Sequence, residues 1–254
     1  MSATFSPGTF RPAPKRASAG AIIFAQGGME AKLMLRHGEQ QLLSIIIPLA
    51  ILIGTARLES STGHGLHEVF PMVLAVAATS AGFTGQAISL AFDRRYGALK
   101  RTGASGVPAW AIIGGKIIGV LTMVVFQILV LGATAFALGL RISAPGILLM
   151  IVSLMFGVAA FTAMGLVLGG TLSSEAVLAL ANLIWFILLA IVGWALYSQG
   201  LGDNGLLNIV PTVALAGALA DASNSTFPGI ELISLTAWLA VASYAAVRWF
   251  RFDG

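Results

Sequence analysis

Charged residues and cysteine are both scarce in this sequence. Only 9% of its 254 residues are Asp, Glu, Lys or Arg, whereas 57% are hydrophobic. A soluble domain carries about 25% charged residues, so the composition excludes an ordinary soluble domain and favours a polytopic membrane protein. The absence of cysteine excludes disulfides, thiol catalysis and cysteine metal sites.

Motifs for nucleotide and metal chemistry are also missing. No Gly-x4-Gly-Lys-Ser/Thr phosphate loop occurs, so this chain does not bind ATP by that device, and no His-Glu-x-x-His motif occurs either. His64 and His67 lie close to Glu59 and Glu68, a grouping that allows a metal site. We favour a solvated polar loop instead, because His-rich metal tracts are denser, and we expect no metal.

Ionisable residues inside the apolar runs are rare. Lys116 lies one or two turns into a run and is expected to snorkel to the cytoplasmic surface. Glu231 is expected at the outer interface, and Glu175 in a turn where Ser173 or Ser174 caps the next helix. Buried charge usually marks an ion pathway, so this scarcity argues against a proton-coupled carrier and an intramembrane enzyme, which remain the alternatives.

Long apolar segments are what the sequence does contain. A transmembrane helix needs roughly 20 mostly apolar residues. Six segments qualify as spans of an all-α membrane protein: Gln41 to Ala56, Val69 to Phe92, Trp110 to Leu140, Ile147 to Leu172, Ala176 to Tyr197 and Ile230 to Trp249.

The distribution of Lys and Arg predicts the orientation of these spans. Twelve of the 14 basic residues fall before the first span, around the connection between the second and third (Arg94 to Lys116), or at the end of the sixth (Arg248 and Arg251), which leaves Arg57 and Arg141 for the other side. Basic residues favour the cytoplasmic side, so both termini are predicted to be cytoplasmic in a multi-pass protein of the cell membrane. The net charge of +4 is explained by this orientation and not by nucleic acid binding.

Three segments are not expected to span. Residues 1–20, rich in Pro and basic residues, are predicted to be a flexible cytoplasmic tail before a single membrane domain at residues 21–254. The segment Ala21 to Glu39 predicts a helix in the cytoplasmic interface, with Glu30, Lys32 and Arg36 on its polar face; an extension of the first span is the alternative. Leu206 to Ala222 predicts outer re-entrant or interfacial helices between spans five and six, and a surface loop is the alternative.

Polar residues inside the spans are candidates for a translocation pathway. Interhelical hydrogen bonding is the alternative role for each of them. The candidates are Ser80, Thr84, Gln86, Gln127, Thr162 and Asn182.

The loop FDRRYGALKRTGAS, Phe92 to Ser105, concentrates charge between two apolar spans. The spacing of Phe92, Tyr96 and Leu99 predicts one helical face surrounded by cations, which suits docking to a cytosolic partner. The alternative is that these charges only set the topology. The candidate docking residues are Phe92, Asp93, Arg94, Arg95, Tyr96, Gly97, Leu99, Lys100 and Arg101.

The stretch FDRRYGALKRTGASGVPAWAIIGGK resembles a junction in the permeases of bacterial type-2 ATP-binding-cassette exporters, which export drugs, lipids or polysaccharides. The final VRWFRFDG also resembles the basic and aromatic tail of that family. One departure is Asp93, where the family usually has Glu. The matching positions are Gly97, Leu99, Lys100, Arg101, Trp110 and Lys116.

This resemblance implies a half-transporter without its own motor. Two permease subunits, identical or paralogous, would associate with two cytosolic ATPase subunits that hold ATP and Mg²⁺, while membrane lipids surround the spans. Phe92 to Ser105 would be the coupling helix, and Ala21 to Glu39 would be a connecting helix that also touches the ATPase. The chain itself is then expected to be neither an enzyme nor the site of a bound cofactor.

Overall fold

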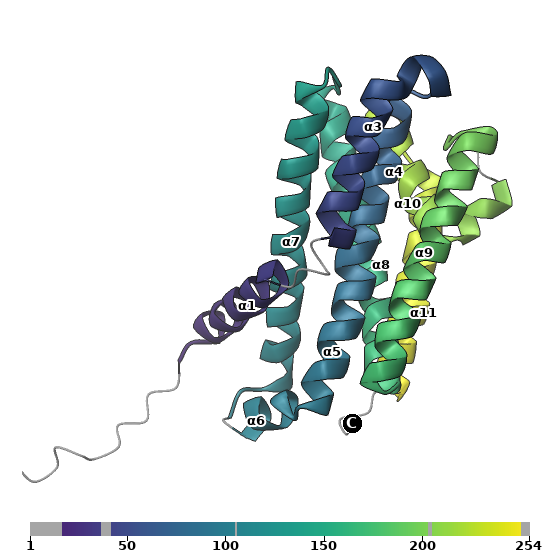
Figure 1. The fold of residues 1–254 in the computed structure, drawn as a ribbon. Helices are drawn as coiled ribbons and strands as arrows, with labels where there is room; N and C mark the ends of the chain where they lie inside the picture. The colour runs from purple at the N-terminus through teal and green to yellow at the C-terminus, as the bar shows by residue number, and fades with distance from the viewer. Residues whose placement is uncertain (1–16, 37–41, 105, 203–204, 250–254) are drawn as a thin grey trace, which may run out of the picture.

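A computed structural model describes residues 17–36, 42–104, 106–202 and 205–249. Within these ranges the chain is helical and contains no strand, which confirms the all-α prediction. The long helices stand side by side in one bundle (Figure 1). Most of the predicted tail at residues 1–20 lies outside the described residues, as do residues 37–39 of the predicted interfacial helix and residues 250–254.

Five helical segments are long and apolar enough to cross a membrane. They confirm the second to the sixth predicted spans. The first is continuous from Leu66 to Arg95 and consists of α4 (Leu66–Thr79), a π-helical turn (Ser80–Gly85) and α5 (Gln86–Arg95). The other four are α7 (Ala109–Ala137), α8 (Ala144–Thr171), α9 (Ser174–Gln199) and α11 (Gly229–Trp249).

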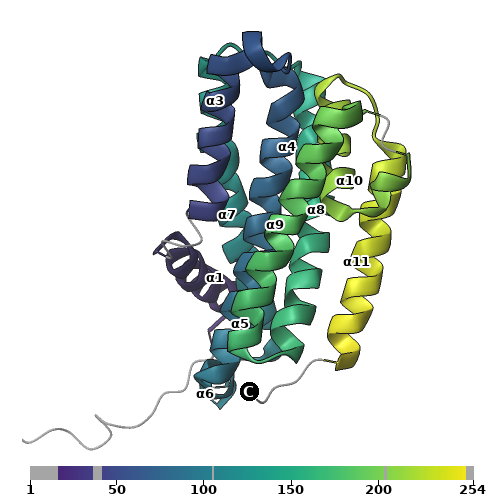
Figure 2. The ribbon, with the colours of Figure 1, turned by 45° about the vertical axis from the view of Figure 1, so that its right-hand side comes forward.

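The segment expected as the first span is also helical, but it is shorter. A π-helical turn (Leu42–Ile46) leads into α3 (Ile47–Thr62). The apolar part of this helix, Ser44–Arg57, falls short of the roughly 20 residues that a straight span needs. In Figure 2, α3 stands beside α4 over the upper half of the bundle only.

The continuous helix α4–α5 occupies the centre of the bundle, where α3, α7, α8, α9 and α10 (Pro211–Ser223) pack around it. Small residues make such close packing possible. A Cβ on Gly169 would lie only 2.4 Å from the carbonyl oxygen of Ala87, so α8 touches the backbone of α5. The large, fully buried side chains around this axis include Trp185, Phe161, Leu215 and Leu219.

Serine side chains cap the N-termini of two of the spanning helices. Ser143 Oγ accepts a hydrogen bond from Gly146 N at 3.1 Å at the start of α8, and Ser173 Oγ accepts one from Ala176 N at 3.4 Å at the start of α9. Each satisfies a backbone donor that the first helical turn leaves free. The prediction that Ser173 or Ser174 caps the fifth span is confirmed for Ser173.

The segment between α9 and α11 forms a short 3-10 turn (Gly205–Ile209) followed by α10. Figure 2 places α10 in the upper half of the bundle, beside α4 and α8. A Cβ on Gly157 of α8 would lie 2.6 Å from the side chain of Leu215, which shows how closely α10 is packed. The predicted helices between the last two spans are therefore confirmed, and α10 dips into the bundle as a re-entrant helix does.

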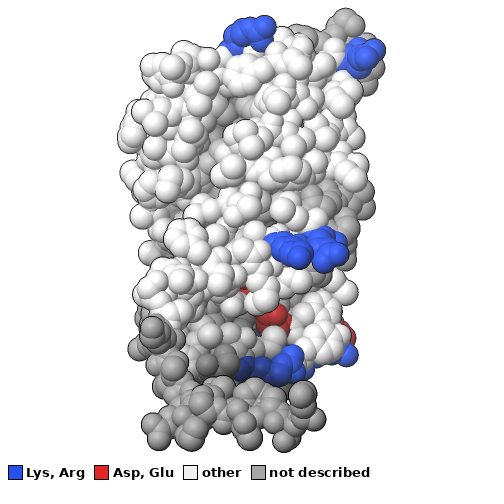
Figure 3. All heavy atoms as spheres, turned by 90° about the vertical axis from the view of Figure 1, so that its left-hand side faces the viewer, with Lys and Arg blue, Asp and Glu red and all other residues white. Residues whose placement is uncertain are grey.

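Basic residues on the face shown in Figure 3 form two groups. One lies at the upper edge and the other runs from about mid-height to the lower end, with a band free of charged atoms between them. The lower end in Figure 1 carries α6 (Ala98–Ala104) and the end of α11. Arg57 and Arg141 belong to the upper end, near the connections that follow α3 and α7. This separation matches the count that led to the predicted orientation, which itself stays a prediction.

Candidate functional site

The connection between α5 and α7 contains a sharp turn and a short helix. Helix α5 ends at Arg95, Gly97 adopts a positive φ of 65°, and α6 then begins at Ala98. A left-handed residue after a helix is most easily glycine, because glycine has no Cβ to clash. The expectation that Phe92, Tyr96 and Leu99 share one helical face is therefore wrong for Leu99, which lies beyond the turn.

Helix α6 lies at the lower end of the bundle in Figures 1 and 2. Tyr96 is 62% exposed, and Lys100 and Arg101 are exposed as well. The rings of Phe92 and Tyr96 stack with their centroids 5.9 Å apart, and the guanidinium of Arg95 lies 5.8 Å from the centre of the Tyr96 ring. This end therefore presents a cationic and aromatic surface, which we call the α6 surface: Tyr96, Leu99, Lys100 and Arg101.

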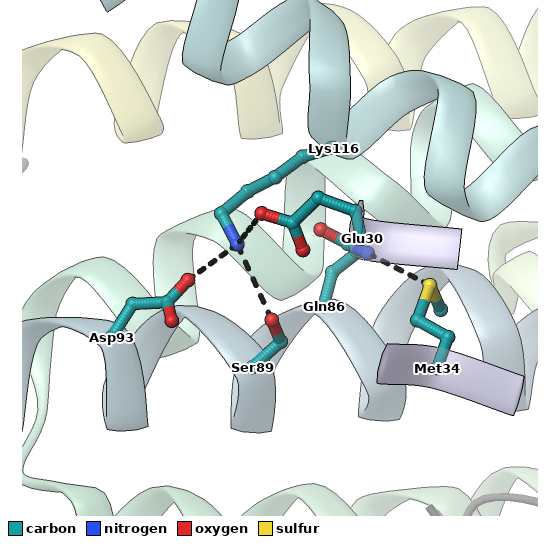
Figure 4. Close-up of polar contacts among 6 residues, drawn as sticks. All are labelled: Glu30, Met34, Gln86, Ser89, Asp93 and Lys116. Atoms are coloured by element: carbon teal, nitrogen blue, oxygen red, sulfur yellow. Dashed lines mark hydrogen bonds and ion pairs between the residues drawn. The ribbon is translucent and has the colours of Figure 1, made fainter. Parts of the chain in front are cut away.

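Asp93 does not belong to that surface, because it points toward Lys116 of α7 (Figure 4). Lys116 Nζ lies 2.6 Å from Asp93 Oδ2 and 3.1 Å from Glu30 Oε1. It also donates to Ser89 Oγ at 3.2 Å. One ammonium group thus joins two carboxylates and one hydroxyl, and it connects α1 (Ala19–Arg36), α5 and α7. We call these four residues the Lys116 cluster.

The position of Lys116 corrects the sequence prediction. Lys116 was expected to snorkel to the cytoplasmic surface, but it is only 4% exposed. Helix α1 lies obliquely across the lower half of α7 and covers it (Figure 1). Glu30, expected on the polar face of an interfacial helix, is likewise buried at 5% exposure. Lys32 and Arg36 remain exposed, as predicted.

Glycines allow α1 to approach α7 closely enough for this ion pair. A Cβ on Gly115 would lie 2.4 Å from Gln26 Cγ, and one on Gly119 would lie 2.9 Å from Glu30 Cβ. From the other side, a Cβ on Gly27 would lie 2.5 Å from Ile118 Cγ2. The spacing of Gly115 and Gly119 is the small-x3-small pattern of packed membrane helices. This pattern was the signal that could have identified the contact from sequence.

The two arginines that follow Asp93 bind the opposite side of α5 to the end of α8 and the start of α9. Arg94 Nη1 donates to the carbonyl oxygens of Gly169 at 2.8 Å and Leu172 at 3.0 Å, at the end of α8. A cation there satisfies free carbonyl groups and complements the helix dipole. Arg94 was predicted to face a partner, but it is buried because these carbonyls bind it. Arg95 donates to Ser174 Oγ at 3.1 Å and forms an ion pair with Glu175 at the start of α9.

Most pathway candidates lie inside the subunit. Ser80, Thr84, Gln86, Gln127 and Thr162 are all buried. Only Asn182 is partly exposed, and its amide donates to the carbonyl oxygen of Leu178 at 3.1 Å, one turn back in α9. Their role in a pathway stays a prediction.

Gln127 makes hydrogen bonds between helices. Pro48 has no N–H, so the carbonyl of Ser44 loses its usual helical donor. Gln127 Nε2 lies 3.4 Å from this oxygen and 3.0 Å from the carbonyl oxygen of Ala77, beside the π-helical turn of the central helix. Trp185 Nε1 donates to the neighbouring carbonyl of Val76 at 3.4 Å. Gln127 therefore joins α7 to α4 and to the π-helical turn that leads into α3, as the alternative interpretation of the polar residues proposed.

Two predictions about ionisable residues can also be compared with the structure. His64 pairs with Glu68 at 2.5 Å, and no group of three or more metal-ligating side chains occurs within the described residues, which leave out the side chain of Glu59. The absence of a metal stays a prediction. Glu231, expected at the interface, is only 5% exposed, and its Oε1 accepts a hydrogen bond from Asn208 Nδ2 at 2.9 Å. The argument that the chain lacks buried carboxylates is therefore wrong for Glu30 and Glu231.

The contacts at the lower end of the bundle can transmit a displacement of α6 to the neighbouring helices. Residues 93–95 contact α7, α8 and α9, Lys116 extends these contacts to α1, and the α6 surface follows directly. A comparison with protein families matches residues 27–201 to the model of the ABC-2 type transporter. No curated protein matches the sequence.

Proposed function

Because this chain belongs to the ABC-2 type transporter family, we propose that it is the membrane-spanning subunit of an ATP-driven exporter. The family makes it a multi-pass membrane permease, and the chain has no phosphate-binding loop of its own. In this proposal a separate cytosolic ATPase holds ATP and Mg²⁺, docks on the α6 surface and touches α1 near Lys32 and Arg36. The end that carries α6 then faces the cytoplasm.

The observation that carries this proposal is the position of the residues just before α6. Asp93, Arg94 and Arg95 contact three neighbouring helices, whereas Tyr96 and Arg101 are exposed beyond them. A force applied to α6 would therefore reach α7, α8 and α9 through direct contacts, and α1 through Lys116. Closure of a pair of ATPases on ATP is the kind of rigid-body motion that such contacts transmit.

A second permease subunit completes the proposed translocation pathway. Much of α9 presents large apolar side chains outside the subunit, including Leu183, Phe186 and Trp194. Such a surface suits lipid or another membrane subunit. The second subunit is identical or paralogous, and Asn182 of α9, the partly exposed pathway candidate, would act where the two subunits meet.

The test of this function is reversal of charge on the α6 surface. We expect a variant with both Lys100→Glu and Arg101→Glu to insert normally but to lose most of its association with the co-expressed ATPase, because an attractive surface becomes repulsive. Leu99→Asp should act in the same direction. Co-purification and ATPase-dependent export are the measurements.

Arg248→Glu is the matched control, because Arg248 is exposed at the end of α11, away from the α6 surface. This variant should keep both association and export. Undiminished ATPase association in the double variant would refute the proposed docking surface.

An ion-coupled carrier is the second candidate, favoured by the buried carboxylates of Glu30 and Glu231. Glu30 is paired with Lys116, which makes it a poor carrier of a mobile proton. Transport by the purified permease in vesicles without any ATPase, driven by a pH gradient, would establish the carrier and exclude the exporter.

A further inference from the structure

A groove of about 460 Å³ lies between the 3-10 turn and the first half of α11, at the end of the bundle opposite α6. Its walls are mostly apolar and include Leu206, Ile209, Ile230, Ile233 and Val241. Because α11 is a spanning helix and these side chains are exposed, the groove opens toward the space that lipid tails fill. Its volume falls within the range of small-ligand sites, about 300 to 1,000 Å³.

One part of the groove is polar. Asn208 lines it and is 7% exposed. Its Nδ2 donates to Glu231 and its backbone oxygen accepts from Ser234 Oγ at 2.5 Å, but its Oδ1 has no hydrogen-bond partner within the described residues. A buried acceptor without a donor is costly, so a ligand that donates a hydrogen bond here would be favoured.

The charge beside Asn208 is negative. Glu231 accepts the Asn208 amide, and Asp221 is close enough that the Glu231 charge acts on it. No ion pair joins either carboxylate to a basic residue in the described part of the chain. Arg141, a basic residue at this end, donates instead to the carbonyl oxygens of Phe136 and Leu140 in its own loop. A donor that is also a cation would satisfy both features.

We propose that this groove binds a phospholipid with a primary ammonium headgroup, which donates to Asn208 Oδ1 beside Glu231 while an acyl chain lies along Ile233 and Val241. The apolar walls take the chain, and the acidic polar end selects the headgroup. A choline headgroup has the same charge but no N–H, so it fits less well. The lipid is a bound component of the subunit, independent of any exported substrate.

Native mass spectrometry of the purified full chain, titrated with phosphatidylethanolamine or phosphatidylcholine, tests this site. We expect tighter binding of the ethanolamine lipid. In Asn208→Leu this preference should fall by about tenfold, the effect of one lost hydrogen bond to a charged group. Glu231→Gln should weaken the binding of both lipids, because both headgroups carry the same positive charge. Equal binding of the two lipids by the wild type would overturn the proposal, as would an unchanged preference in Asn208→Leu.

Ile233→Trp provides a test that leaves the polar end intact, because it only fills the groove. It should reduce binding of both lipids, whereas Tyr244→Trp, on an exposed position of α11 outside the groove, should not. Binding of dodecylamine without binding of the ethanolamine lipid would show that the site takes single-chain amines, and would overturn the lipid assignment. A change in oligomeric state of Ile233→Trp with unchanged lipid binding would assign the groove to subunit contact instead.

Discussion

Lys116 holds three helices together through ion pairs. Its ammonium group contacts Glu30 of α1 and Asp93 of α5 while its backbone belongs to α7. Removing one partner from a buried ion pair leaves an uncompensated charge in a poorly hydrated site, which is more harmful than removing both. The cluster therefore links the position of α1 to that of the α6 surface.

Lys116→Met should lower the free energy of unfolding by about 3 to 5 kcal/mol, because two carboxylates lose their shared cation. Adding Glu30→Gln to this variant should restore part of the loss. Thermal unfolding in detergent measures both. Lys32→Met, on the exposed side of α1, should change stability by less than about 0.5 kcal/mol. A double variant no more stable than Lys116→Met alone would contradict this role.

Asp221 predicts a dependence of stability on pH. Burial, and secondarily the charge of Glu231, raise the pKa of the Asp221 carboxyl above its ordinary value. The folded protein then favours the protonated form, so the stability associated with it is complete below the ordinary pKa, about 3.9, and is lost as pH rises through the raised pKa.

We therefore expect Asp221→Asn, in lipid-free detergent, to be more stable than the wild type at pH 7. This advantage should shrink as pH falls toward 4, where the wild-type carboxyl is itself neutral. Parallel melting curves at several pH values measure the difference. A constant difference between the two proteins across this range would show that Asp221 does not titrate as described.

Glycines on both sides set the distance between α1 and α7. Gly115 faces Gln26, and Gly27 faces Ile118, with no room for a Cβ at either position. Helix α7 also contains Gly132, where nothing lies within 4 Å of an added Cβ. Gly115 and Gly132 therefore differ in the space available to an added Cβ. Because both belong to α7, they form a matched pair of positions for testing the contact.

Gly115→Val should separate α1 from α7 and weaken the reach of Glu30 to Lys116, whereas Gly132→Val should leave the contact unchanged. A cysteine pair reports the contact, since the chain has no cysteine of its own. A Cβ at position 114 would lie 3.5 Å from Ile23 Cγ1, so Ile23→Cys with Gly114→Cys should form a disulfide on oxidation. Equal disulfide yields with Gly115→Val and Gly132→Val would refute the close approach.

The arrangement of the whole molecule could be predicted from its sequence only in part. Length and apolarity predicted six spans, of which five are long enough in the structure, together with the re-entrant α10 and the position of α6, because each depends on local composition. Residues such as Glu30 and Lys116 were misplaced because their burial depends on which helices meet, and 86 residues separate them in sequence. The spacing of Phe92, Tyr96 and Leu99 likewise predicted one helical face, but the left-handed conformation of Gly97 separates Leu99 from the other two.

The central claim is that the end carrying α6 holds the ATPase. The direct measurement is site-specific cross-linking in native membranes, with single cysteines introduced by Arg101→Cys on α6 or by Leu206→Cys, which is 86% exposed at the opposite end. The account predicts that the cysteine at position 101 cross-links to the co-expressed ATPase and the one at position 206 does not. Cross-linking from position 206 alone, or from neither position while export continues, would contradict it.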